Sequence, residues 1–402
     1  MRKKLFTTMV VLAAVASVMI TGCSSSNAGT TESTTKVQET TTEAQETTTE
    51  KTEETSQAVE EKDAEYYYEL GRYYLYGTDG NEIDLETAYA NFMMAEEMGY
   101  TEANFYLGVL FDWYGYPNKD YVTAREYYEA CGENPYAQIS LGFLYYNGQG
   151  VDKDEERAKE LFQSVVDQGC VEGYLGLACI VQNESDYYTA YEYYNKASEG
   201  TEPLFVAKAM FDIGRMYYRG EGVEQDYAKE MEWYEKAADL GYADAMHNIG
   251  YMYNYGEGVE QDYAKALEWY EKAAKGGNGS SANNIGYMYF YGEGVEQDYD
   301  KALEWYEKAV GMGNTTAMRS IGYMYFYGKG VEQDYAKGLE WYEKAAGMGD
   351  TAAMNNIGYI YFYGEGVEKD NSKALEWFEK AIELGNEDAK YTAEHLREIL
   401  NQ

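Results

Sequence analysis

The stretch AMHNIGYMYNYGEGVEQDYAKALEWYEKAA, from Ala245 to Ala274, decides the fold of this chain. Its first part repeats apolar side chains at i, i+3, i+4 and i+7, the spacing of one helix face. The residues with this spacing are Met246, Ile249, Gly250 and Tyr253. The glycines of Gly256-Glu257-Gly258 end the pattern, and Asp262, a favoured N-cap residue, opens a second helical pattern. The stretch therefore predicts a helix, a turn and a second helix.

The same unit recurs along the chain. Gly follows Leu or Ile at positions 71, 108, 142, 214, 250, 286, 322 and 358, and Gly176 lies between Leu175 and Leu177. Five tryptophans keep the same step as the last five of these glycines: Trp233, Trp269, Trp305, Trp341 and Trp377. A fixed period of this length is typical of a solenoid, in which each unit is expected to contact only its neighbours. A Gly inside each first helix predicts a close helix contact that forbids a Cβ.

The unit A-M-x-x-I-G-Y-M-Y-x-Y-G-E-G-V-E-Q-D-Y-x-K-A-L-E-W-Y-E-K-A-A resembles the Sel-one-like repeats, relatives of the tetratricopeptide repeats. Five close copies run from Ala209 to about Ala389, and four looser copies run from Tyr67 to about Ser198. The resemblance implies an all-α fold, an α–α superhelical solenoid of about nine helix-turn-helix repeats. It also implies that the first helix of each unit lines the concave side, and that the family binds partners and assembles complexes.

The amino terminus is typical of an export signal. Three cations precede the apolar run from Leu5 to Ile20, and Ile20-Thr21-Gly22-Cys23 resembles the bacterial lipobox, in which the Cys is diacylated. We therefore expect a lipoprotein anchored at Cys23 on the extracytoplasmic side of a bacterial cell membrane. The alternative is an ordinary secretory signal in which Cys23 is incidental. The Thr, Ser and Glu residues that follow predict a disordered tether, because they bury too little apolar surface.

These patterns divide the chain into five parts. Residues 1–22 are the signal peptide, 23–62 the lipidated Cys with its disordered linker, and 63–206 the irregular repeats. Residues 207–389 are the five regular repeats, and 390–402 are expected to form a capping helix.

Composition disfavours several classes of function. The chain has 32 Lys and Arg against 71 Asp and Glu, a net charge of −39, which disfavours a nucleic-acid partner. The acidic turns, with Glu257, Glu260 and Asp262, lack the alternating spacing of calcium loops and are interpreted as a solvated edge with an N-cap. We find no phosphate loop, metal-ligand spacing or nucleophile elbow. The sequence therefore predicts no enzyme activity, no metal and no cofactor.

Ligand-binding residues are expected on the concave face of the first helices. Residues six and three before the repeated Gly, and one and four after it, share one face. Each of these four positions, followed from unit to unit, forms one row along the solenoid. The row four after the Gly contains Tyr218, Asn254, Phe290, Phe326 and Phe362. The first two rows vary between units and the last two are mainly aromatic. The ligand-binding residues predicted from them are His247, Asn283, Arg319 and Asn355, together with Tyr251, Tyr287, Tyr323 and Tyr359.

The chemistry of these rows leaves several functions open. Tyr with Asn suits an extended peptide or a protein partner, and the acidic surroundings favour a basic one. We expect a monomer acting as a scaffold or adaptor, with the lipid anchor as the only membrane contact. The alternatives are a structural spacer, cell-wall glycan binding through the aromatic rows, or aromatic rows that only pack between helices. Among Cys131, Cys170 and Cys179 at most one disulfide is expected, and a Cys170–Cys179 bond requires Cys170 to lie in a turn.

Lipidation at Cys23 is directly testable. Metabolic labelling of the wild-type chain with a fatty acid should tag the protein, and Cys23→Ala should lose the tag, because the thiol is the acylation site. An unlabelled wild type released into the medium would contradict the anchor.

Overall fold

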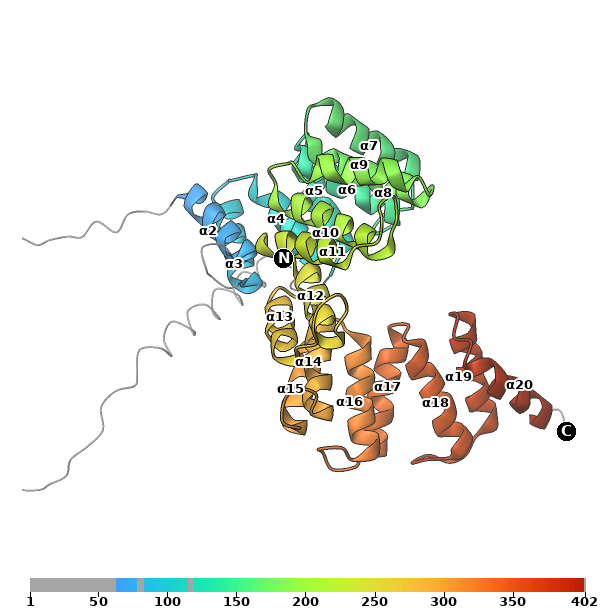
Figure 1. The fold of residues 1–402 in the computed structure, drawn as a ribbon. Helices are drawn as coiled ribbons and strands as arrows, with labels where there is room; N and C mark the ends of the chain where they lie inside the picture. Colours follow the sequence, from blue (N-terminus) through green and yellow to red (C-terminus); the bar gives the residue numbers. More distant parts are fainter. Residues whose placement is uncertain (1–62, 78–82, 115–118, 401–402) are drawn as a thin grey trace, which may run out of the picture. The chain divides into compact units, whose positions relative to one another are not determined.

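The computed structural model describes residues 63–77, 83–114 and 119–400, and these belong to one compact unit that begins at Asp63. The signal peptide, Cys23 and the Thr/Glu-rich stretch lie outside the described residues. The described residues form helices and no strand (Figure 1). Within the described ranges, every helix is too short or too polar to cross a membrane.

The helices follow one another in pairs, here called helix A and helix B of units 1 to 9. The pairs, A before B, are α2 (Ala64–Tyr76) and α3 (Leu85–Glu97), α4 (Ala103–Val109) and α5 (Tyr121–Ala130), α6 (Pro135–Asn147) and α7 (Glu155–Asp167), α8 (Tyr174–Asn183) and α9 (Tyr187–Ala197), α10 (Pro203–Arg219) and α11 (Tyr227–Asp239), α12 (Ala243–Tyr255) and α13 (Tyr263–Lys275), α14 (Gly279–Tyr291) and α15 (Tyr299–Gly311), α16 (Thr315–Tyr327) and α17 (Tyr335–Gly347), and α18 (Thr351–Tyr363) and α19 (Asn371–Glu383). A π-helical turn, η2 (Leu110–Tyr114), extends α4, a 3-10 turn, η3 (Val171–Gly173), precedes α8, and α20 (Ala389–Leu400) comes last.

Contacts between the helices confirm the predicted all-α solenoid. Each helix A contacts its own helix B most, and each helix B then contacts the next helix A. The helix ends follow from local chemistry, as the sequence predicts. The Asp262 carboxylate accepts hydrogen bonds from the backbone N–H groups of Ala264 and Lys265 at 3.1 Å, and Gly256 closes α12 in the left-handed region with φ 72°.

The repeated glycine of helix A lies against an aromatic ring of helix B. A Cβ built on Gly250 would lie 2.7 Å from a ring carbon of Tyr270, which is closer than carbon atoms pack. The same contact recurs at Gly71/Phe92, Gly108/Tyr128, Gly142/Phe162, Gly214/Tyr234, Gly286/Tyr306, Gly322/Tyr342 and Gly358/Phe378. Gly176 of unit 4 meets Phe162 of the preceding unit instead. These contacts confirm the close helix approach expected from the sequence.

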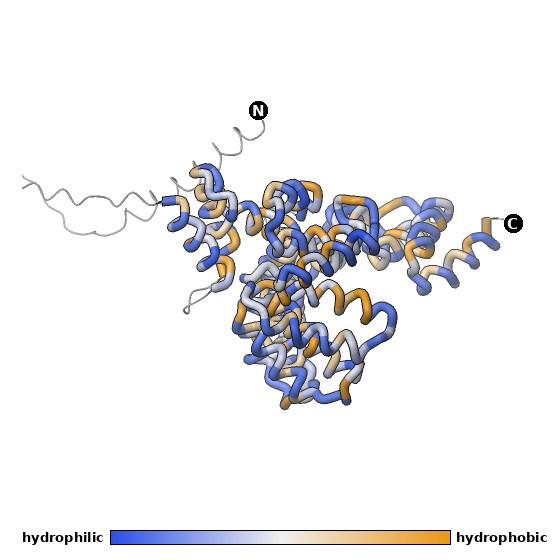
Figure 2. The backbone as a smooth tube through the Cα atoms, turned by 90° about the horizontal axis from the view of Figure 1, so that it is seen from above, coloured by the Kyte–Doolittle hydropathy of each residue, from blue (hydrophilic) through white to orange (hydrophobic). Residues whose placement is uncertain are grey.

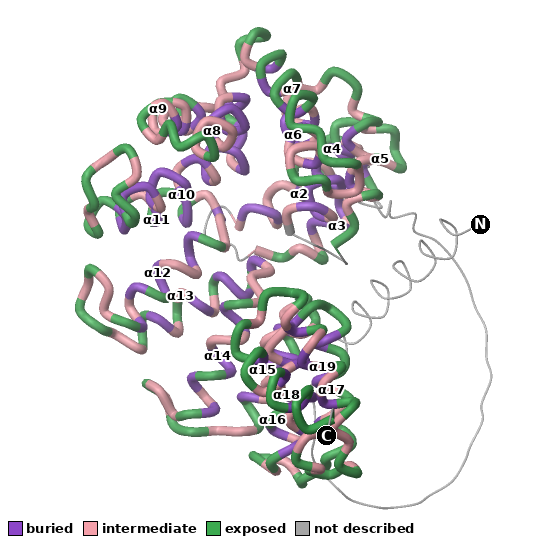
Figure 3. The backbone as a smooth tube through the Cα atoms, turned by 90° about the vertical axis from the view of Figure 1, so that its right-hand side faces the viewer, coloured by how far each residue is buried: buried purple, intermediate pink, exposed green. Residues whose placement is uncertain are grey.

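Helix B carries a second repeated arrangement on its polar side. The Lys272 ammonium lies 4.4 Å from the centre of the Trp269 ring and 2.9 Å from the Glu268 carboxylate. Lys236, Lys308, Lys344 and Lys380 lie over their tryptophans at 3.9 to 4.4 Å. Polar and apolar residues alternate along the helices (Figure 2). Exposed residues gather at the turns between the helices (Figure 3).

The expectation that units contact only their neighbours is wrong for the first half of the solenoid. The buried Glu202 carboxylate, directly before α10, accepts hydrogen bonds from the hydroxyls of Tyr76 in α2 and Tyr106 in α4. A Cβ on Gly241 would also lie 2.8 Å from the carbonyl oxygen of Tyr76. Units 1 and 2 therefore contact the start of unit 5 and the turn before unit 6.

The length of α10 explains these long-range contacts. It has 17 residues, whereas helix A of each later unit has 13, and its extra first turn carries Phe205. The Phe205 ring is fully buried, with ring centres of Trp113 at 5.7 Å, Tyr136 at 5.9 Å and Phe105 at 6.2 Å. The first five units thus form one closed block around the start of α10.

The three cysteines of the described residues are free thiols. Cys170 does lie in the turn before η3, but its Sγ contacts a Glu172 carboxylate oxygen at 3.1 Å. Cys179 lies in α8, with its Sγ 3.5 Å from the Tyr194 hydroxyl. The structure therefore has no Cys170–Cys179 disulfide.

The glycine contact predicts a clear difference between two substitutions. Gly286→Ala should lower the free energy of unfolding by about 1–3 kcal/mol, because the new methyl group meets the buried Tyr306 ring at 2.6 Å. Gly311→Ala is the matched control, since a Cβ there meets nothing within 4 Å and Ala favours helix. Denaturant titration followed by circular dichroism measures both. Equal stabilities of the two variants would contradict the packing role of the repeated Gly.

Candidate functional site

Two rows of exposed tyrosines lie on helix A of units 6 to 9. One row is one residue after the repeated Gly and the other is five residues after it, so the two Tyr of each helix are i,i+4 neighbours. The eight residues, here called the tyrosine strip, are Tyr251, Tyr255, Tyr287, Tyr291, Tyr323, Tyr327, Tyr359 and Tyr363. Ring centres within the four pairs are 4.4, 4.3, 4.7 and 6.1 Å apart. Seven of the eight are 39% to 62% exposed, and Tyr359 is half-buried.

The tyrosine strip is continuous from unit to unit. The pKa of Tyr287 is raised by partial burial, then by Glu293, by its pair Tyr291, and by Tyr255 of the preceding unit. The pKa of Tyr327 is raised by burial, then by Glu365 of the next unit and by Tyr323. Side chains of successive units are therefore close enough to interact electrostatically.

Carboxylates border the strip. Glu257, Glu293 and Glu365 each follow the Gly that ends a helix A, and Lys329 takes this place in unit 8. Glu257 contributes to raising the pKa of Tyr251 after burial, as Glu293 does for Tyr287. The strip thus combines flat aromatic surface, hydroxyl groups and a mainly acidic edge.

The second row of the strip is not among the residues predicted from the sequence, which placed a different row on this face. Each residue of an α-helix is rotated by about 100° around the helix axis from the one before it. The residue four after the Gly therefore lies about 40° around the axis from the Gly, and the residue five after it lies about 140° around the axis. The row four after the Gly accordingly packs in the core of units 6 to 8, with Asn254 and Phe290 7% exposed and Phe326 1% exposed, whereas Phe362 is half-buried and Tyr218 is 40% exposed. Its assignment to the ligand face is wrong for units 6 to 8. The i,i+4 repetition of Tyr in the sequence was the signal for this second exposed row.

The four varied positions lie beside the strip, and two of them bridge neighbouring units. The Nδ1 atom of half-buried His247 is 2.8 Å from the hydroxyl of Ser281 in the next helix A, and burial lowers the pKa of this imidazole. The Arg319 guanidinium donates two hydrogen bonds to Asp350, at 2.8 and 2.9 Å. Asn283 and Asn355 are half-buried, and their side-chain oxygens have no hydrogen-bond partner among the described residues.

The row six before the Gly also bridges units. The Asn278 amide donates to the Asp244 carboxylate at 2.8 Å, and the Asn314 amide lies 3.5 Å from the Ser280 hydroxyl. Residues of these two rows therefore contribute to packing between neighbouring units.

Unit 5 carries cations where the later units carry the strip. Arg215 and Arg219 take the positions of the two tyrosines, and they line a pocket of about 320 Å³ together with Lys208. Buried Asp212 pairs with both Lys208 and Arg215, so these charges are largely compensated within the pocket.

Among the described residues, no three His, Cys, Asp or Glu side chains are grouped to hold a metal ion. The exposed surface is thus suited to stacking and hydrogen bonding.

The bridge from Arg319 makes a prediction about stability. Arg319→Ala should cost about 1–3 kcal/mol, because it leaves Asp350, whose side chain is 5% exposed, without its cation. Arg157→Ala is the control, since the Arg157–Glu160 pair is solvent-exposed and worth less than about 1 kcal/mol. Thermal unfolding of both variants measures the difference. Two equal melting temperatures would show that Arg319 does not connect units 8 and 9.

Comparison with known proteins agrees with this architecture. Nine stretches match the Sel1 repeat: residues 64–100, 101–130, 135–170, 174–201, 207–242, 243–278, 279–314, 315–350 and 351–386. HRD3B of Arabidopsis thaliana, an ERAD-associated E3 ubiquitin-protein ligase component, is 36% identical over 94 residues, which is 23% of this chain and only 14% of that protein.

Solved structures with similar folds include two bacterial proteins. One is c5321 of uropathogenic Escherichia coli, a protective antigen displaying an SLR fold, with 29% identity over 82% of this chain and 79% of that one, and a TM-score of 0.43. The other is a Sel1 repeat protein from Oxalobacter formigenes, with 29% identity over 74% of this chain and 86% of that one, and a TM-score of 0.46. Because the nine matched stretches cover most of its length, the chain belongs to the Sel1 repeat family.

Proposed function

We propose that this chain is a scaffold that binds an extended, basic segment of a partner protein along the tyrosine strip. The observation that carries the proposal is the continuous run of exposed Tyr pairs on four successive units. Large aromatic groups that face solvent in the same place on four successive units form an exposed apolar surface of the kind that marks binding sites. A ligand that repeats its contacts from unit to unit suits this surface.

The chemistry of the strip favours a protein segment with Lys and Arg. Tyr presents a large rigid surface with a hydroxyl and loses little conformational entropy on binding. Cations bind over aromatic faces, and the chain itself uses this interaction: the Lys337 ammonium lies 3.8 Å from the ring centre of Tyr325. Glu257, Glu293 and Glu365 add carboxylates at the edge of the strip. A cationic side chain would therefore find both an aromatic face and a counter-charge.

Overall charge supports the same partner. A net charge of −39 attracts a basic segment over distance and raises its association rate, more at low salt than at high salt. The family relative HRD3B is named as a component of a ubiquitin ligase, which is a multi-protein assembly. That name supports a scaffold role in general and says nothing of this partner.

We also propose that the scaffold is anchored at Cys23 on the outer side of a bacterial membrane. The support is the basic, apolar and small-residue order of the first 23 residues, and the polar stretch that follows would act as a spacer.

Selection of peptides from a random twelve-residue library on the full chain tests the binding proposal. We expect enriched peptides to carry several Lys or Arg residues, and their affinity to fall as salt is raised. The triple variant Tyr255→Ser, Tyr291→Ser and Tyr327→Ser should weaken the selected peptides at least tenfold. These side chains are 49% to 58% exposed, so helicity and melting temperature should change little.

A matched control uses tyrosines that are equally exposed but off the strip. Tyr188→Ser and Tyr391→Ser, at 66% and 82% exposure, should leave peptide affinity unchanged. Enrichment of acidic peptides, or equal binding by the strip variant and the control, would contradict the proposal and favour the spacer function.

A further inference from the structure

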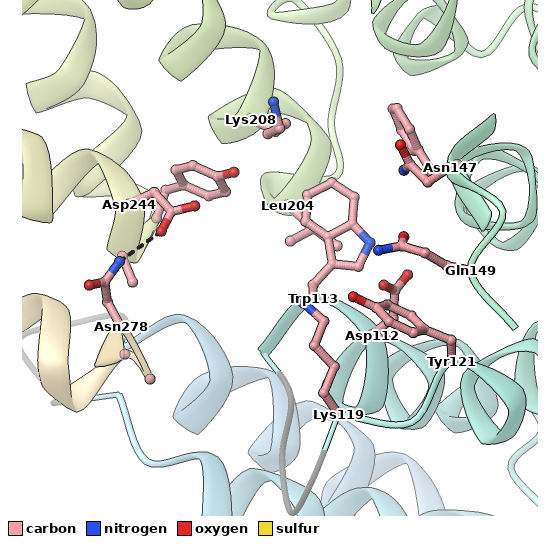
Figure 4. A pocket seen from close by; sticks show the side chains of 15 residues that line it. Asp112, Trp113, Lys119, Tyr121, Asn147, Gln149, Leu204, Lys208, Asp244 and Asn278 are labelled. Atoms are coloured by element: carbon pink, nitrogen blue, oxygen red, sulfur yellow. Dashed lines mark hydrogen bonds between the residues drawn. The ribbon is translucent and has the colours of Figure 1, made fainter. Parts of the chain in front are cut away.

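A separate pocket lies where the closed block of the first five units meets α12 and the turn after α13. Its volume is about 270 Å³, and it is lined from units 2 and 3 on one side and from α10, α12 and the turn after α13 on the other (Figure 4). It exists only because the start of α10 packs against α4 and α6. None of its lining residues belongs to the tyrosine strip.

A π-helical turn supplies two of the lining side chains. The residues four and five after Gly108 are Asp112 and Trp113, and both lie in η2, where α4 widens. Such turns are rare and frequently occur at functional sites. Edge-to-face contacts with Phe143 at 6.1 Å and Phe205 at 5.7 Å fix the plane of the Trp113 indole. The turn thus holds a carboxylate and an aromatic ring at the pocket.

Asp112 has fewer hydrogen-bond partners than Glu202 and Glu172, two other buried acids of the block. The residue is 7% exposed, and its side chain accepts one long hydrogen bond, from the Tyr128 hydroxyl at 3.3 Å. By contrast, Glu202 accepts from two hydroxyls, and Glu172 accepts from two backbone N–H groups and from Thr201 and Cys170. Burial raises the pKa of Asp112 to about 6, although Lys119 and the Tyr128 hydroxyl lower it in part. The carboxylate keeps acceptor capacity for a ligand.

Polar groups around Asp112 also lack protein partners. The side-chain amides of Asn147 and Gln149 and the indole N–H of Trp113 form no hydrogen bond with the described residues, although all three side chains line the pocket (Figure 4). The turn that carries Gln149 is held in place, because the Arg125 guanidinium donates to the carbonyl of Gly150 at 3.1 Å. Several donors and acceptors therefore line the pocket with no hydrogen-bond partner among the described residues.

The formal charges of the pocket balance. Lys119 and Lys208 oppose Asp112 and Asp244. Three of the four are already engaged: Lys208 pairs with Asp212, Lys119 lies 5.3 Å from the ring centre of Tyr121, and Asp244 accepts from Asn278. The lining therefore has no net formal charge, which favours neither an anion nor a cation. A neutral ligand with many hydrogen-bonding groups fits better.

We propose that this pocket binds one neutral pyranose ring, with an apolar face of the sugar on the Trp113 indole and its hydroxyls on Asp112, Asn147 and Gln149. A sugar ring combines an apolar C–H face with a rim of hydroxyls that both donate and accept. The carboxylate accepts, the indole N–H donates, and the amides do both. The volume lies just below the ~300–1,000 Å³ usual for small-molecule pockets, which suits a single ring.

Ligand-observed NMR on the full chain tests this site with free glucose, galactose, mannose and N-acetylglucosamine. At least one sugar should show saturation transfer and quench tryptophan fluorescence, and the quenching should disappear in Trp113→Phe. Trp113 is the one tryptophan of six that lines the pocket. Asp112→Asn and Gln149→Ala should each weaken the sugar at least fivefold.

Controls separate the site from folding and from the strip. Gln163→Ala, an exposed Gln on α7, and the triple strip variant should bind the sugar as the wild type does. Because Gln149 lies in a turn, its variant should keep the wild-type melting temperature. Three results would overturn the proposal: no sugar binding at 50 mM, sugar binding unchanged in both Asp112→Asn and Gln149→Ala, or preference for lysine methyl ester, acetate or a nucleoside over every sugar.

Discussion

The contact between the repeated Gly of helix A and an aromatic ring of helix B is the constraint on which the rest of the structure depends. Because Gly250 has no Cβ, the Tyr270 ring lies directly against the helix A backbone, and the two helices approach closely along one fixed face. Once that face is fixed, the geometry of the helix decides where every other residue points. Tyr251 and Tyr255 then face outward, and Met246 and Ile249 face the core. The outward orientation of the tyrosine strip in units 6 to 9 thus follows from the glycine contact.

Features that are local and repeated could be predicted from the sequence. The period, the Asp262 N-cap, the Gly256 helix end and the close approach at Gly250 all depend on neighbours in sequence or on the adjacent unit. The contacts of Glu202 and Phe205 could not be predicted, because each occurs once and joins residues about one hundred positions apart. Trp113 of the π-helical turn makes one of these long-range contacts, with Phe205. No periodic pattern carries that information.

Variation between copies of a repeat is ambiguous evidence for a ligand. His247 and Arg319 differ from unit to unit, and the sequence analysis interpreted this variation as recognition. In the structure His247 contacts Ser281 and Arg319 binds Asp350, so each varied residue is matched to a varied partner in the next unit. A solenoid whose units must stack in one order would need such matched pairs. Exposure after packing, which the sequence does not contain, is the better criterion, and it selects the Tyr rows.

The two halves of the solenoid differ in the kind of site they can form. In units 6 to 9 each unit repeats the same surface, so a ligand there meets equivalent Tyr pairs and can gain affinity by lengthening its contact. The extra turn of α10 brings distant units together, and the pocket beside it is lined by units 2 and 3, α10, α12 and the turn after α13, a combination that does not recur from unit to unit. A single small ligand suits such a pocket, and a long flexible segment does not. The pocket depends on the closure of the first five units, whereas the tyrosine strip depends on the repetition of units 6 to 9. A substitution that opens the block around Glu202 should therefore change ligand binding in the pocket and leave the tyrosine strip intact.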